Sequence, residues 1–105
     1  MSFYKYWQVP KPIKKADDMK LLSDNHNEKE VFTLISKIKD TIINCKQEDN
    51  IINKESEKGN YSLSMVYNSY KCENLQKAAI LLKKEKYEGF DYNYSKDCVI
   101  RISWN

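Results

Sequence analysis

Near its C-terminal end the chain reads Cys98-Val99-Ile100-Arg101-Ile102-Ser103-Trp104. Every second residue from Cys98 to Trp104 is apolar, which is typical of a β-strand with one buried face. Two other stretches, 61–67 and 90–94, alternate in the same way and are also predicted to be strands. Because the last stretch is the most apolar of the three, we expect it to be the central strand of a small sheet.

The segments between these strands predict how they are connected. Ser95-Lys96-Asp97 is a short turn, so the last two strands should form an antiparallel hairpin. Residues 71–88 predict a helix that ends at Gly89, with Ile80 and Leu81 flanking its inward face. This helix connects the first two strands as a right-handed β-α-β crossover, so we expect a mixed sheet.

The first half of the chain predicts helices. Asp17 and Asp18 suit the first turn of a short helix over 15–24. A capping box, Asn27 to Glu30, predicts the start of a second helix, and an apolar stripe follows it. That helix either continues to Lys58 or breaks near residues 48–50, and Gly59 is its natural stop in both cases. The stripe comprises Val31, Leu34, Ile35, Ile38, Ile42 and Cys45.

These elements predict one α+β domain over residues 14–105, in the order α-β-α-β-β. Each strand has a single apolar face, so the helices should cover one side of the three-stranded mixed sheet. The other side should be polar and open, and Arg101 at its centre is a candidate partner-binding residue. The open face would present Ser62, Ser64, Asp91, Asn93, Arg101 and Ser103.

Residues 1–13 are predicted to form an extended arm, because Pro10 and Pro12 disfavour a regular helix. An arm with so many apolar groups should dock on a surface. It either adds a fourth strand to its own sheet, the simpler placement, or enters a groove or sheet edge of a partner. The candidate partner-binding residues of the arm are Phe3, Tyr4, Tyr6 and Trp7.

Composition excludes several classes of protein. The 105 residues suit one domain, and the chain lacks an apolar run long enough for a transmembrane helix or a signal peptide. The net charge of +3 is too small to require a nucleic-acid or membrane partner. Cys45, Cys72 and Cys98 are odd in number and lack a Cys-x-x-Cys pair, which predicts free, buried thiols in a reducing compartment.

The sequence offers little for catalysis. His26 is the only histidine, so neither a catalytic dyad nor a histidine metal site is expected. The two glycines are too few for a phosphate-binding loop. We therefore expect no enzyme, no catalytic residues, no metal and no cofactor. Binding of nucleic acid stays as an alternative, because lysines are interleaved with aromatic residues in the arm and Lys83, Lys84 and Lys86 cluster on one helix.

Three short motifs resemble small uncharacterised proteins of tailed bacteriophages and large DNA viruses. They are Gly59-Asn60-Tyr61-Ser62-Leu63, Glu88-Gly89-Phe90 and Ile100-Arg101-Ile102-Ser103-Trp104. The resemblance implies a viral origin but no functional residues. The resulting hypothesis is a non-enzymatic accessory or virion-associated protein, in the virion or the host cytoplasm, that acts by protein–protein contact. A nucleic-acid-binding protein and an inhibitor of a host defence protein are the alternatives.

Overall fold

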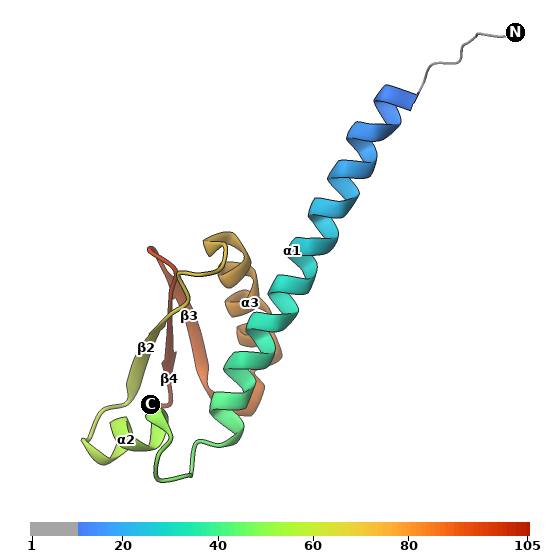
Figure 1. Ribbon diagram of the computed structural model, residues 1–105. Coiled ribbons are helices and arrows are strands. Elements are labelled where there is room, and N and C mark those ends of the chain that lie inside the picture. Colours follow the sequence, from blue (N-terminus) through green and yellow to red (C-terminus); the bar gives the residue numbers. More distant parts are fainter. Residues whose placement is uncertain (1–10) are drawn as a thin grey trace, which may run out of the picture.

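The computed structural model describes residues 11–105, with side chains from Lys15 onward. A long helix α1 (Lys11–Ile43) is followed by a short helix α2 (Ile51–Glu57) and strand β2 (Ser62–Val66). Helix α3 (Cys72–Glu85), a short 3-10 turn (Tyr87–Gly89), and strands β3 (Asp91–Ser95) and β4 (Val99–Ser103) complete the chain (Figure 1). The predicted α+β class is confirmed. Helix α2 adds one helix to the expected order, as the alternative of a break near residues 48–50 predicts.

The sheet has the strand order β2-β4-β3, so the expectation that the last strand is central is confirmed. Ile100 of β4 lies opposite Met65 of β2 and Tyr94 of β3. Both edge strands run antiparallel to β4. The sheet is therefore antiparallel rather than mixed, because β2 and β3, which run in the same direction, are separated by the central strand.

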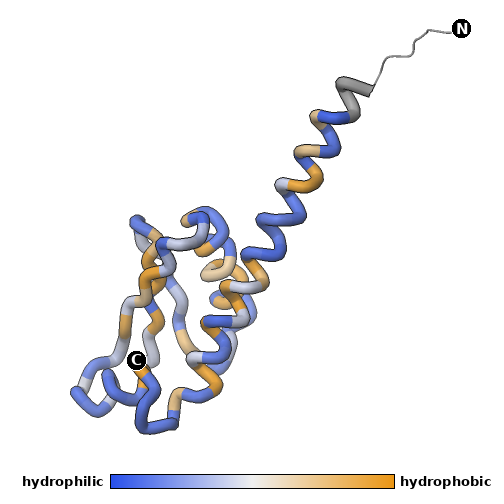
Figure 2. Tube along the Cα trace, in the orientation of Figure 1, coloured by the Kyte–Doolittle hydropathy of each residue, from blue (hydrophilic) through white to orange (hydrophobic). Residues whose placement is uncertain are grey.

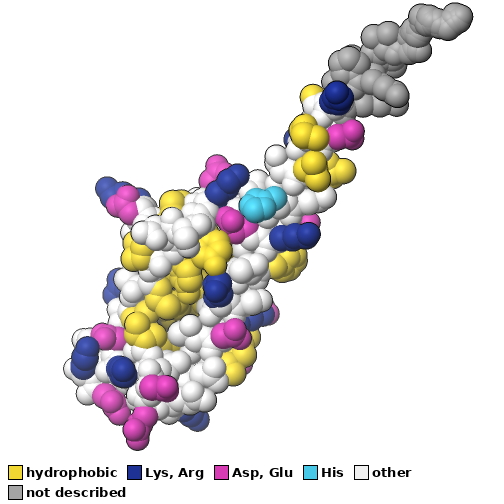
Figure 3. Space-filling model, viewed as in Figure 1, with side chains coloured by type: hydrophobic (Ala, Val, Ile, Leu, Met, Phe, Trp, Pro, Cys, Tyr) yellow, Lys and Arg dark blue, Asp and Glu magenta, His cyan; other side chains and the backbone are white. Residues whose placement is uncertain are grey.

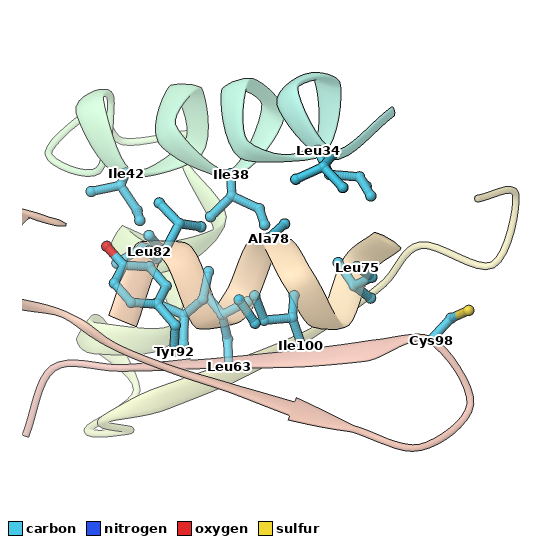
Figure 4. Packing of buried hydrophobic residues seen from close by; sticks show 14 residues of the cluster. Leu34, Ile38, Ile42, Leu63, Leu75, Ala78, Leu82, Tyr92, Cys98 and Ile100 are labelled. Atoms are coloured by element: carbon cyan, nitrogen blue, oxygen red, sulfur yellow. The ribbon is translucent and has the colours of Figure 1, made fainter. Parts of the chain in front are cut away.

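Both long helices lie on the same side of the sheet, as expected, with α3 between α1 and the strands (Figure 4). Leu34, Ile38 and Ile42 of α1 point toward Leu75 and Leu82 of α3. The side of α3 that faces the strands meets buried Tyr92 and Ile100. The core is thus built from the predicted stripe of α1, the predicted inward face of α3 and one face of the sheet.

Helix α1 differs from the prediction at both of its ends. It is a single helix through Asn27, so the predicted capping box does not form. It also begins at Lys11, so residues 11–13 of the predicted arm are helical. Pro12 is tolerated there because the first helical turn has no intrahelical partners for its backbone N–H groups. The helix ends at Ile43, and the Asn50 side chain caps α2 by accepting a hydrogen bond from the backbone N–H of Ile52 (2.8 Å).

The ends of the shorter helices depend on left-handed residues. Gly59 has φ +85° directly after α2, so its predicted role as a helix stop is confirmed. Helix α3 ends earlier than predicted. Lys86, with φ 54°, stops it, and its backbone N–H bonds back to the carbonyls of Leu82 and Lys83. Gly89, with φ 76°, instead lies at the end of the 3-10 turn that leads into β3.

Cys72 and Cys98 form a disulfide. The expectation of three free thiols is therefore wrong for this pair, and the inference of a reducing compartment, which rested on free thiols, loses its basis. Spacing in sequence gave no sign of the bond, because the fold brings the start of α3 against the β3–β4 turn, where the two Cα atoms are 4.7 Å apart. Cys45 is free, as expected, but it is half-buried rather than buried.

The N-terminal half of α1 projects away from the rest of the protein (Figure 1). Every residue from Lys15 to His26 is exposed, whereas buried positions begin at Val31. In the tube coloured by hydropathy, hydrophobic positions recur along this projecting half as well as in the body (Figure 2). Within residues 11–105, no helix is both long and apolar enough to span a membrane.

Candidate protein-binding surfaces

The structure describes one of the five predicted partner-binding residues. Phe3, Tyr4, Tyr6 and Trp7 lie outside the described residues. Arg101 is exposed at the centre of the open sheet face, between Ser64 of β2 and Asn93 of β3. Its Nη2 donates a hydrogen bond to Ser62 Oγ (3.0 Å). The sheet face is polar, as predicted, because the core-facing residues of each strand alternate with these polar ones.

Polar groups at one edge of this face are held by a lysine from the helix layer. Lys83 of α3 reaches around the edge strand, and its Nζ lies 2.8 Å from Asn93 Oδ1 and 3.5 Å from Asp91 Oδ1. Asn93 Nδ2 in turn donates to Asp91 Oδ2 (2.8 Å). These interactions hold the pKa of Asp91 below its usual range, and the hydrogen bond from Asn93 is the largest cause. Lys83 is thus part of a local polar network.

An apolar surface lies on the helix side of the molecule, away from the open face of the sheet, between the outer sides of α1 and α3. We call it the α1–α3 groove. It is lined by α1 from Asp24 to Lys39 and by α3 from Lys77 to Glu85. Two adjoining cavities of about 570 and 560 Å³ make up the groove, and both are lined by Phe32 and Leu81.

The floor of the groove is hydrophobic and open. Phe32 is 64% exposed, Ile80 56% and Leu81 47%, although the three come from two packed helices. Their neighbours on the core side, such as Leu34 and Ala79, are almost fully buried. Contiguous exposed apolar side chains of this size mark interaction sites more often than single exposed residues do.

Charged residues flank the groove at the end nearest the C-termini of α1 and α3. Lys39 Nζ lies 3.3 Å from Glu85 Oε2 and 4.5 Å from the centre of the Tyr87 ring. Lys84 lines the same cavity, and the structure shows no ion pair for it with any residue of the described part. The groove therefore offers an apolar floor with a free positive charge near one end.

A partly buried hydrogen-bond junction fixes the two walls of the groove at its other end. Glu30 Oε1 of α1 accepts from the backbone N–H of Lys71 and from Asn74 Nδ2, both at 2.9 Å. Asn74 Nδ2 also donates to Asn27 Oδ1 (3.2 Å). These donors lower the pKa of Glu30, with the Asn74 hydrogen bond as the largest cause. The predicted capping residues thus hold the start of α3 rather than the start of their own helix.

Sequence reasoning missed the groove. Ile80 and Leu81 were placed beside the inward face of α3, but Phe32 follows the buried Val31 and lies outside the apolar stripe. The sequence does contain a pattern that includes Phe32, which is a second line of residues at helical spacing along α1. Leu21, Asn25, Glu28, Phe32 and Ile35 follow one another at steps of four, three, four and three residues. Such spacing places them on one side of the helix.

Within the part of the chain that the structure describes, no three His, Cys, Asp or Glu side chains are grouped in a way that suits a metal ion. Comparison with known proteins found no matching family model, curated protein or solved structure.

Proposed function

We propose that the protein acts by binding another protein chain in the α1–α3 groove. The observation that carries this proposal is the joint exposure of Phe32, Ile80 and Leu81 on the floor of the groove. A single exposed apolar side chain costs little, but three adjacent ones from two helices leave a continuous apolar surface in water. An occupant that buries them would gain roughly 25 cal/mol per Å² of apolar surface removed from water.

The shape of the groove favours a helix as the occupant. Two roughly parallel helices form its walls, and side chains of a third helix interdigitate well between such walls. Because Lys71 and Asn74 bind Glu30 at one end and Lys39 binds Glu85 at the other, the walls are held together before a partner arrives. A preformed groove binds without the cost of ordering its own walls.

The proposal also covers the origin of the protein and the place where it acts. The likeness of the C-terminal motifs to small viral proteins supports a virion component or an accessory protein in the infected host cell. The sheet face around Arg101 is a second place for contact, but its side chains already bond to one another. Binding without enzymatic chemistry therefore remains the function that we propose for this chain.

Photo-cross-linking of the full chain tests the groove. A photo-reactive phenylalanine analogue is placed at position 32 or 81, and at Glu48 as a control in the exposed loop after α1. We expect protein adducts from positions 32 and 81 and few or none from position 48. Adducts of either kind, with a second copy of the chain or with a different protein, support groove binding. Equal labelling at all three positions, or none at 32 and 81, would overturn it.

A further inference from the structure

The projecting half of α1 leaves apolar side chains in water. Leu21 is 58% exposed and Leu22 60% exposed, and Figure 3 shows hydrophobic side chains along this part of the helix. No other element of the described chain packs against residues 15–23, and the groove begins at Asp24. A helix of this length without packing is only marginally stable in water. The projecting half therefore gains most from a surface that covers one of its sides.

A single line of residues connects the projecting half to the groove. Leu21 lies on the projecting part beyond the groove, whereas Asn25, Glu28, Phe32 and Ile35 line the groove. Their alternating steps of four and three residues are those of a helix–helix contact line. We call these five residues the α1 seam. The same line thus presents an apolar knob at one end and an apolar groove floor at the other.

We propose that a second copy of this chain binds in the groove, with the two α1 helices antiparallel and related by a two-fold axis between His26 and Asn27. This inference rests on the proposed function and names its partner. Under this symmetry Leu21 faces Phe32 of the partner subunit, and Asn25 faces Glu28 of the partner subunit. The seam maps onto itself, which is the condition for a closed two-fold interface.

The lengths of the two surfaces agree. The helix from Lys11 to His26 is about 24 Å long at 1.5 Å per residue, and the groove wall from Asp24 to Lys39 has nearly the same length. With the two-fold axis between His26 and Asn27, the groove wall from Asp24 to Lys39 lies opposite residues 29–14 of the other copy, most of which belong to its projecting half. A shorter projection would leave part of the groove floor exposed.

Polar groups along the seam are also complementary. The side-chain amide of Asn25 is a donor, and the Glu28 carboxylate that it faces is an acceptor. Asp18, one helical turn before Leu21, comes opposite Ile35 of the partner subunit. That position shares its cavity with Lys39 and Lys84. Because Lys84 has no ion pair among the described residues, it is free to bind Asp18 of the other copy.

A pair of adjacent leucines provides the first test. Leu21 lies on the seam, whereas Leu22 points about 100° away around the helix, and the two are almost equally exposed. Sedimentation velocity of the full chain should show a dimer for the wild type. Leu21→Glu should raise the dimer dissociation constant at least about tenfold, because it places a charge against Phe32, while Leu22→Glu should change it less than about threefold. Equal effects of the two substitutions would overturn the proposed seam.

Cysteine pairing tests the antiparallel arrangement. In a Cys45→Ser background, Leu21→Cys chains are mixed with Phe32→Cys chains and oxidised mildly, with each variant alone as a control. A disulfide requires Cα atoms within roughly 7 Å. The mixture should form covalent dimers at least about tenfold faster than either variant alone, because like positions lie about 16 Å apart along the axis. Dimers that form only between like positions would contradict the antiparallel arrangement.

The outcomes separate this inference from the proposed function. A chain that stays monomeric at all concentrations would overturn the two-fold dimer. If photo-cross-linking from position 32 then labels a different protein, groove binding stands and only the identity of the partner is wrong. If neither a dimer nor any protein adduct forms, both proposals fail. Circular dichroism of each variant checks that the substitutions, which lie at exposed positions apart from the half-buried Cys45, leave the fold intact.

Discussion

Glu30 of α1 and Asn74 of α3 are joined by a hydrogen bond from Asn74 Nδ2 to Glu30 Oε1 (2.9 Å) that ties the long helix to the start of the next one. Asn74 is only 2% exposed, and it is the one buried polar residue among the described side chains. The same carboxylate oxygen accepts the backbone N–H of Lys71, which precedes α3. One side chain of α1 therefore binds the N-cap residue of α3, Lys71, which provides no side-chain cap of its own.

Removal of the Asn74 side chain should weaken the fold. Asn74→Ala leaves the Glu30 carboxylate and Asn27 without their buried donor, so we expect the free energy of unfolding to fall by about 1–3 kcal/mol. Urea denaturation followed by circular dichroism measures the change. Asn68→Ala, at an exposed position in the loop after β2, should have little effect. An Asn74 variant as stable as the wild type would show that the junction contributes nothing.

The stability of the protein should fall in acid partly because of Glu30. Its folded pKa lies below the usual value of 4.5, since Asn74 and Lys71 donate to the charged form. The stability that follows from this shift is fully present above the unfolded pKa and is lost as pH falls through the folded pKa. Melting temperatures measured from neutral pH to well below 4.5 should therefore drop more steeply for the wild type than for Glu30→Gln.

Glu30→Gln isolates this contribution because Asp91 and Glu55 also have lowered pKa values and act in the same direction. Both remain in the variant, so the difference between the two pH profiles belongs to Glu30. The glutamine keeps an oxygen that accepts from Lys71 and Asn74, which preserves the junction at neutral pH. Parallel pH profiles for the two proteins would contradict the prediction.

Reduction of the Cys72–Cys98 disulfide should destabilise the folded protein. The bond closes a loop with a sequence separation of 26 residues. In the chain-entropy account, its loss lowers the free energy of unfolding by roughly 3 kcal/mol. Urea unfolding with and without dithiothreitol measures this change, and the Cys45→Ser variant should respond to the reductant as the wild type does. If the reductant had no effect on either protein, the bond would not contribute to stability.

Two isoleucines of α1 should differ sharply in their contribution to the free energy of unfolding. Ile38 is fully buried against α3, whereas Ile43, at the end of the same helix, is 64% exposed. Ile38→Ala should lower the free energy of unfolding by about 2–5 kcal/mol, because it leaves a cavity in the core. Ile43→Ala should change it by less than about 0.5 kcal/mol. Similar losses for the two variants in urea denaturation would mean that the core is not centred on the predicted stripe.

Local patterns were sufficient for the sheet and for the packed faces. Alternation identified the residues of β2, β3 and β4 that face the core, such as Leu63, Tyr92 and Ile100. The greater apolarity of the last strand placed it in the centre, because the central strand has no exposed edge. The stripe from Val31 to Ile42 likewise predicted the buried side of α1. These features depend on which side of an element is apolar, and the spacing of apolar residues in the sequence shows that side directly.

Other features depend on neighbours that are distant in sequence. Asn27 and Glu30 form a local capping pattern, yet they lie inside a longer helix because Asn74 and Lys71 of α3 satisfy them instead. Cys72 and Cys98 pair because α3 begins beside the hairpin turn. The α1–α3 groove exists because Phe32 and Leu81 face the same side once the two helices pack. Local periodicity is thus enough to identify the strands, the helical segments and the side of each that is buried. The junction, the disulfide and the groove each require residues that meet only after the helices and the sheet have packed, so no local pattern could predict them.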